Sequence, residues 1–157
     1  MSKSLERVTS ILKAAGAGFE MRHLTEDTRT AHQTAEAIGC HVNQIAKSII
    51  AQGYESDALF LFLTSGGAQI DPEKAADLCD EPILRPAADF VHALTGFDAG
   101  AVAPCGALTP LKTFMDPALL EYDSIWAAGG TPHAVFSVSP ALLQSISQAT
   151  IGNFTDR

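Results

Sequence analysis

Five segments of the chain have the apolar spacing or the capping residues of helices. The first carries apolar residues on one face and is followed by glycine, which predicts a helix over residues 3–15. Thr30 is a suitable N-cap for a second helix, which is expected to end at Gly39. The other helices are expected from Asp71-Pro72 onward, over 87–94 and over 139–146, with a single turn opened by Asp116-Pro117.

Shorter runs alternate between apolar and polar residues or are rich in β-branched and aromatic residues, which predicts strands. They lie at residues 19–24, 44–51, 58–64, 111–115, 124–128 and 134–138. The second and third runs are separated by a short polar break and are expected to form an antiparallel hairpin. The third run is continuously apolar, which is typical of a strand covered on both faces. Strands interspersed with helices indicate a mixed α/β sheet fold.

The composition is that of one folded domain, expected to span residues 1–157. The chain is 46% hydrophobic and 18% charged, which is enough to form a core. It shows neither the apolar run of a membrane span nor the apolar segment of a signal peptide, so a cytoplasmic protein without membrane contact is expected. Its three cysteines are sparse and odd in number, which favours reduced thiols over disulfides.

The formal net charge of −8 argues against a protein that grips nucleic acid along its phosphate backbone, and no DNA partner is expected. This negative charge does not argue against a protein that binds only the end of an RNA. Histidines and cysteines lack the spacing of metal ligands, so neither a metal nor another cofactor is expected.

Lys47 is the most informative single residue. In an extended segment Ile45, Lys47 and Ile49 share one face, which places one ammonium in an apolar row. One interpretation is an edge-strand lysine that extends to water and prevents aggregation. The other is an ammonium directed into a pocket, where it binds an anion or polarises a carbonyl group. The periodicity alone does not choose between them.

Two glycine-containing segments are further candidates. The loop from Gly100 to Gly106 could bring backbone N–H groups close to a ligand, or it could be an ordinary connection. The Gly129-Gly130 pair could be a plain hairpin turn, and His133 beyond it a surface residue or a pocket wall. Cys105 lies in the first loop, but without a recognisable base a structural thiol is favoured over a nucleophile.

Taken together, these segments resemble the YbaK/prolyl-tRNA-synthetase-associated family. Four strings carry the resemblance in order along the chain: Gln44 to Ile50, Thr64 to Asp71, Gly100 to Pro104, and Ala128-Gly129-Gly130 followed by Ala134 to Val138. The family implies one α/β domain with a curved, partly closed mixed β-sheet flanked by helices. It also implies hydrolysis of mischarged aminoacyl-tRNA, commonly tRNA(Pro) carrying a wrong small amino acid.

The resemblance also implies roles for individual residues. Lys47 corresponds to the functional lysine of the family, and Gly100 to the backbone of its active-site loop. The expected substrate-binding residues are Ile45, Ser48, Ala101, Pro104, Gly129, Gly130 and His133. The expected partners are the acceptor end of an aminoacyl-tRNA, bound transiently, and a prolyl-tRNA synthetase. A synthetase-docking module without activity and a hydrolase of small acylated metabolites are the alternatives.

Overall fold

The computed structural model describes residues 2–16, 18–25 and 30–156. The helices in these ranges are α1 (Lys3–Ala14), α2 (Ala31–Ile38), α3 (Pro72–Cys79), α4 (Ala88–Thr95) and α5 (Pro140–Ser147), with the 3₁₀ turns η1 (Val42–Gln44) and η2 (Pro117–Glu121). The strands are β1 (Glu20–His23), β2 (Ile45–Gly53), β3 (Leu59–Ser65), β4 (Ile83–Leu84), β5 (Lys112–Met115), β6 (Ile125–Ala128), β7 (Ala134–Val138) and β8 (Thr150–Ile151).

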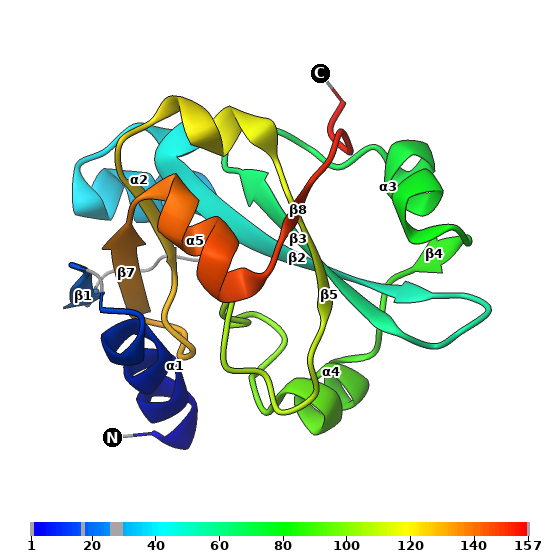
Figure 1. Ribbon diagram of the computed structural model, residues 1–157, viewed down its shortest axis with the longest axis horizontal. Helices are drawn as coiled ribbons and strands as arrows, with labels where there is room; N and C mark the ends of the chain where they lie inside the picture. The colour runs from blue at the N-terminus through cyan, green and yellow to red at the C-terminus, as the bar shows by residue number, and fades with distance from the viewer. Residues whose placement is uncertain (1, 17, 26–29, 157) are drawn as a thin grey trace.

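The strands form one mixed sheet in the order β1-β7-β6-β2-β3-β5-β8, with β4 paired to β2. In Figure 1, β1 and β7 lie on the left of the molecule and β4 on the right. β2 and β3 are antiparallel, which confirms the expected hairpin. The β2–β6, β3–β5 and β5–β8 pairs are parallel. Among the described residues β1 and β8 do not pair with each other, so the sheet is not closed into a barrel. The expected mixed α/β fold with flanking helices is confirmed.

β3 lies at the centre of the protein and is buried along its whole length, as its continuous apolar sequence predicts. Because side chains alternate along a strand, its residues supply two different cores. Leu61 and Leu63 pack in the core that includes residues of α1, α4 and α5. Phe60 and Phe62 pack in a second core with residues of α3.

Local capping explains where several helices begin. Thr30 accepts a hydrogen bond from the backbone N–H of Gln33, whose side chain caps the backbone N–H of Thr30 in return. Asp71 caps α3 ahead of Pro72, and Ser139 caps α5. These helices are confirmed. The turn η1 lies just before β2, and β4 and β8 have two residues each; none of these three was predicted.

No helix in the described part of the chain combines the length and apolar character required to cross a membrane.

Candidate functional site

A break in strand pairing exposes one edge of β2. On one side, β2 pairs with β3 from Ala46 to Gln52. On the other side it pairs with β6 only at Ile45 and Ala46, and with β4 only at Gln52 and Gly53. Within the described residues no strand pairs with that edge over residues 47–51. The sheet therefore opens at Lys47.

A pocket of about 490 Å³ lies at this opening. Its floor is residues 45–49 of β2, and Gly100, Ala101 and Val102 line it from the loop before β5. The remaining walls come from α2 with its N-cap residue, β6, the β6–β7 connection and the start of β7, together with Gly66 and Gln69 from the segment after β3. The structure thus brings together parts of the chain that are far apart in sequence.

Lys47 lies in this pocket and is half-buried. Its Nζ donates a hydrogen bond of 2.6 Å to the carbonyl oxygen of Ala68, a buried residue. Burial lowers the pKa of the lysine, and the carboxylate of Asp156 acts in the opposite direction. An ammonium has three donors, so two remain for a ligand after the bond to Ala68. This geometry favours the pocket interpretation of Lys47 over that of a surface lysine.

The loop residues Gly100 and Ala101 also line the pocket. Gly100 is exposed, its φ angle is outside the left-handed region, and a Cβ built on it would meet no atom within 4 Å. The backbone N–H of Ala101 donates to the carbonyl of Asp98 at 2.8 Å, which removes it as a donor to a ligand. The N–H groups of Gly100 and Val102 have no partner among the described residues.

Other residues predicted for the site lie at its margin or elsewhere. Pro104 lines a separate pocket of about 220 Å³ and not the one that holds Lys47. Gly129, Gly130 and His133 do not line the 490 Å³ pocket, although their neighbours Thr131, Pro132, Ala134 and Val135 do. Gly130 has a φ of +101°, as a tight hairpin turn requires, and its carbonyl accepts from Ser4 Oγ at 2.8 Å. The two glycines therefore shape the connection that carries the pocket wall.

Ile45 and Ser48, for which the sequence predicts substrate binding, both line the pocket. Ile45 is buried. Ser48 Oγ is also buried and has no hydrogen-bond partner among the described residues. Ser48 is shared with a neighbouring, mostly apolar pocket of about 550 Å³ along the same open edge. Ser48 therefore lies where the two pockets meet.

The sequence model of the aminoacyl-tRNA editing domain matches residues 25–146, which span the pocket walls. The chain belongs to this family. A solved structure of a protein proposed to be a trans-editing enzyme for prolyl tRNA synthetase is 37% identical, with a TM-score of 0.90 over 100% of this chain and 99% of the other. The expected relation to the YbaK family is confirmed.

Two further relatives of this editing domain extend the comparison. A structure from work on epitope backbone grafting onto scaffold proteins is 40% identical, with a TM-score of 0.90 over the whole of both chains. The uncharacterized protein YwhH of Bacillus subtilis (strain 168) is 28% identical over 118 residues, which cover 75% of this chain and 74% of that protein. The two structural matches cover the whole chain, whereas the family model covers residues 25–146.

Several pocket residues of the editing domain were not anticipated from its sequence. His32 and Thr34 face the pocket from α2, Gln69 from the segment after β3, and Trp126 from β6. The helical pattern of the sequence predicts which face of α2 is buried, but it does not show which other elements that face contacts. Their common feature, a position beside the open edge of β2, exists only once the sheet is assembled.

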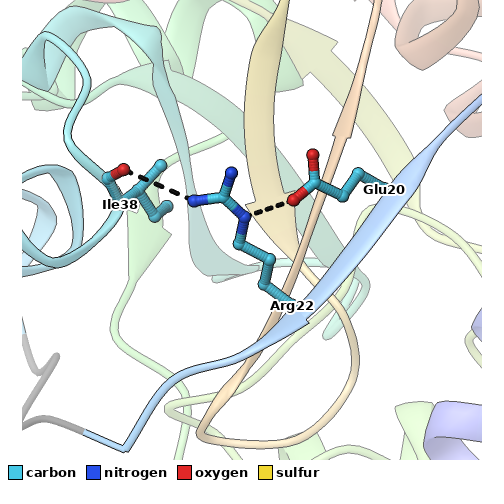
Figure 2. Close-up of polar contacts among 3 residues, drawn as sticks. All are labelled: Glu20, Arg22 and Ile38. Carbon is cyan, nitrogen blue, oxygen red and sulfur yellow. Dashed lines mark hydrogen bonds and ion pairs between the residues drawn. The ribbon is translucent and has the colours of Figure 1, made fainter.

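Arg22 supports the wall formed by α2 and β6. Figure 2 shows its guanidinium reaching from β1 to the backbone carbonyl of Ile38, the last residue of α2, with the carboxylate of Glu20 beside it. The guanidinium also lies 4.8 Å from the centre of the Trp126 ring. One side chain therefore connects three elements around the pocket of the editing domain.

Cys105 lies outside the 490 Å³ pocket and lines the separate one beside Pro104. Burial raises the pKa of its thiol to about 11, so the thiolate needed for nucleophilic attack is scarce at neutral pH. Among the residues that the structure describes, no group of three or more His, Cys, Asp or Glu side chains is arranged to hold a metal ion.

Proposed function

We propose that this protein is an aminoacyl-tRNA deacylase that hydrolyses mischarged tRNA, with tRNA(Pro) carrying alanine or another small amino acid as its substrate. The observation that carries the proposal is the placement of the Lys47 ammonium and the Gly100 backbone on one pocket, at the open edge of β2. Membership of the editing-domain family supports the reaction class. The relation to a proposed trans-editing enzyme for prolyl tRNA synthetase supports the choice of tRNA.

The substrate contains an activated ester, so a protein nucleophile is unnecessary. A water oxygen attacks the carbonyl carbon, the bond from that carbon to the ribose oxygen breaks, and the ribose oxygen takes a proton. The products are the free amino acid and the uncharged tRNA. The ribose 2′-hydroxyl of the terminal adenosine serves to direct the water, in place of a protein base.

The pocket residues would stabilise this reaction electrostatically. The N–H groups of Gly100 and Val102 are the available donors of the loop, and they would bind the developing oxyanion or hold the attacking water. Lys47 would bind the substrate carbonyl or terminal phosphate through the donors not used by Ala68. Where the bound substrate displaces water from the pocket, each of these interactions would be stronger than in bulk solvent.

The acidic net charge fits a protein that contacts the acceptor end of the tRNA alone. Few phosphates are then neutralised, so binding is transient and depends only weakly on salt. Selection of one tRNA would come from a few acceptor-stem contacts or from association with prolyl-tRNA synthetase. Editing is useful because a hydrophobic synthetase pocket rejects a near-isostere by only about 1–3 kcal/mol.

Deacylation of a panel of charged tRNAs tests the proposal. Purified protein is mixed with alanyl-, cysteinyl-, seryl- and prolyl-tRNA(Pro), and release of the amino acid is followed under single-turnover conditions. We expect hydrolysis of alanyl-tRNA(Pro) and sparing of prolyl-tRNA(Pro). No hydrolysis of any member would favour a docking module. Hydrolysis of free aminoacyl esters but not of charged tRNA would favour a metabolite hydrolase.

Lys47→Met provides the matched mechanistic variant, since it keeps an unbranched side chain that replaces the stem of the lysine and removes the charged amino group. The loss of a charge-assisted interaction of about 1.5–3 kcal/mol predicts a rate reduced about 10- to 150-fold. Lys13→Met, on the exposed end of α1, is the control and should retain the wild-type rate. A folded Lys47→Met protein with wild-type turnover would contradict the role of Lys47.

A further inference from the structure

A short segment near the end of the described chain runs alongside the pocket wall that follows β3. Ile70 and Thr155 form an antiparallel β-bridge. The backbone N–H of Asp156 donates to the carbonyl of Gln69 at 3.0 Å, and the N–H of Gln69 donates to Asp156 Oδ1 at 3.3 Å. Both the backbone and the side chain of Asp156 therefore bind one residue of that wall.

The segment has firm anchors of its own. Phe154 is fully buried against Phe62, with ring centres 4.9 Å apart, and its carbonyl accepts from the N–H of Asp71 at 2.8 Å. The carbonyl of Thr155 accepts a hydrogen bond of 2.9 Å from Lys74 Nζ. These contacts hold the backbone of Asp156 beside the wall, and its side chain adds the hydrogen bond to Gln69.

The wall that Asp156 holds is the one to which Lys47 is bound. Ala68, whose carbonyl accepts from Lys47 Nζ at 2.6 Å, directly precedes Gln69. Restraining Gln69 therefore restrains the acceptor that directs the ammonium into the pocket. The carboxylate of Asp156 also provides negative charge near the ammonium, which raises the pKa of Lys47 against the effect of burial.

We propose that Asp156 is a positioning residue for Lys47: its hydrogen bonds to Gln69 fix the Ala68–Gln69 wall that holds the Lys47 ammonium in the pocket, and its carboxylate acts on that ammonium from beside the wall. The inference rests on the proposed function for its consequence in catalysis, but its effect on Lys47 can be measured without any substrate. Asp156 itself does not line the 490 Å³ pocket.

Other charged groups near the pocket must be separated from this effect. His32 lines the pocket from α2, and Lys74 donates to the segment itself from α3. Neither is altered by substitutions at position 156. Asp156 is exposed, so its electrostatic influence on Lys47 should weaken at high salt, whereas its backbone hydrogen bond should not.

The experiment compares Asp156→Asn, which removes the charge and keeps an acceptor, with Asp156→Ala, which removes both. Asp77→Asn is the matched control, because it removes one exposed carboxylate from the neighbouring helix α3. The charge state of Lys47 is followed by its rate of acetylation with acetic anhydride across a pH range, quantified by peptide mass spectrometry. Single-turnover deacylation is measured over the same range.

In Asp156→Asn we expect the Lys47 acetylation midpoint and the alkaline limb of the deacylation rate to move together to lower pH. The sign follows because the charged form of Lys47 loses a favourable neighbour. Asp156→Ala should show the same shift and, at neutral pH, a further loss of rate of about three- to tenfold from the freed wall. Asp77→Asn should match the wild type, and high salt should reduce the shift.

An unchanged acetylation midpoint in both Asp156 variants would overturn the proposal. So would equal losses of rate in the two variants without any pH shift, since that result would leave only a packing role. If the wild type deacylates no charged tRNA, the proposed function fails, and the acetylation measurement still decides whether Asp156 controls Lys47.

Discussion

Replacement of Gly100 tests the role of the pocket, because its effect on catalysis can be separated from any effect on folding. A Cβ at this position would have no atom of the protein within 4 Å, and the backbone is not in the left-handed region. Gly100→Ala and Gly100→Val should therefore fold normally. A Gly→Ala change at a compatible position even stabilises a protein by about 0.4–1 kcal/mol, through the unfolded chain.

The cost should appear only when substrate is bound. Gly100 lines the 490 Å³ pocket that also holds Lys47, so added methyl groups would occupy space where we propose that the ester binds. Forcing extra methyl groups into a packed contact costs about 1–3 kcal/mol, which corresponds to a rate reduced about 5- to 150-fold. Alanine should fall at the low end of this range, and valine, with two more methyl groups, at the high end.

The assay is single-turnover deacylation of alanyl-tRNA(Pro), with thermal unfolding measured on the same preparations. Gly18→Ala and Gly18→Val are matched controls, since a Cβ at Gly18 also meets no atom within 4 Å and Gly18 does not line the pocket. Both controls should keep the wild-type rate. A Gly100→Val protein that folds and hydrolyses alanyl-tRNA(Pro) at the wild-type rate would refute the placement of this loop at the ester.

Cys105→Ala should retain most deacylase activity, and abolished activity or a trapped acyl-thioester would contradict a structural role for this thiol. In the wild type, alkylation of Cys105 by iodoacetamide at pH 8 should be slow, because burial raises the pKa of the thiol to about 11. Arg22→Ala should lower the free energy of unfolding in urea by about 1 kcal/mol, because it removes the guanidinium from the Trp126 ring. Arg22→Lys should restore only part of that stability, because an ammonium lacks the planar face, and full rescue by lysine would argue against stacking. Phe62→Ala should lower the free energy of unfolding in urea by about 3–5 kcal/mol, because the ring is fully buried between two other aromatic rings. A loss below about 1 kcal/mol would contradict that packing.

The sequence by itself determined the local elements of this protein and the identity of its principal polar residue. Thr30, Asp71 and Ser139 begin helices because each cap bonds to a backbone group two or three residues away. The apolar run of β3 predicted burial on both faces because its composition alone excludes a solvated face. Lys47 was conspicuous for the same kind of reason, as a charge in an apolar row.

The tertiary structure alone decided what Lys47 faces. The open edge of β2 arises because β6 pairs with two of its residues and β4 with two others, and β4 is too short for any periodic signal. The same assembly placed Pro104 in a different pocket and engaged the N–H of Ala101 within its own loop.

The partners of Lys47 come from equally distant parts of the chain. Its acceptor on Ala68 lies 21 residues away in sequence, and Asp156 contacts Gln69 across 87 residues. Local sequence patterns reflect interactions between residues that are close in sequence. These contacts depend instead on which strands pair and on the burial of Phe154, which holds Asp156 beside Gln69. The chemistry of the site was therefore visible in the sequence as a single residue, and its surroundings became defined only when the strands paired into one sheet and left an edge of β2 open.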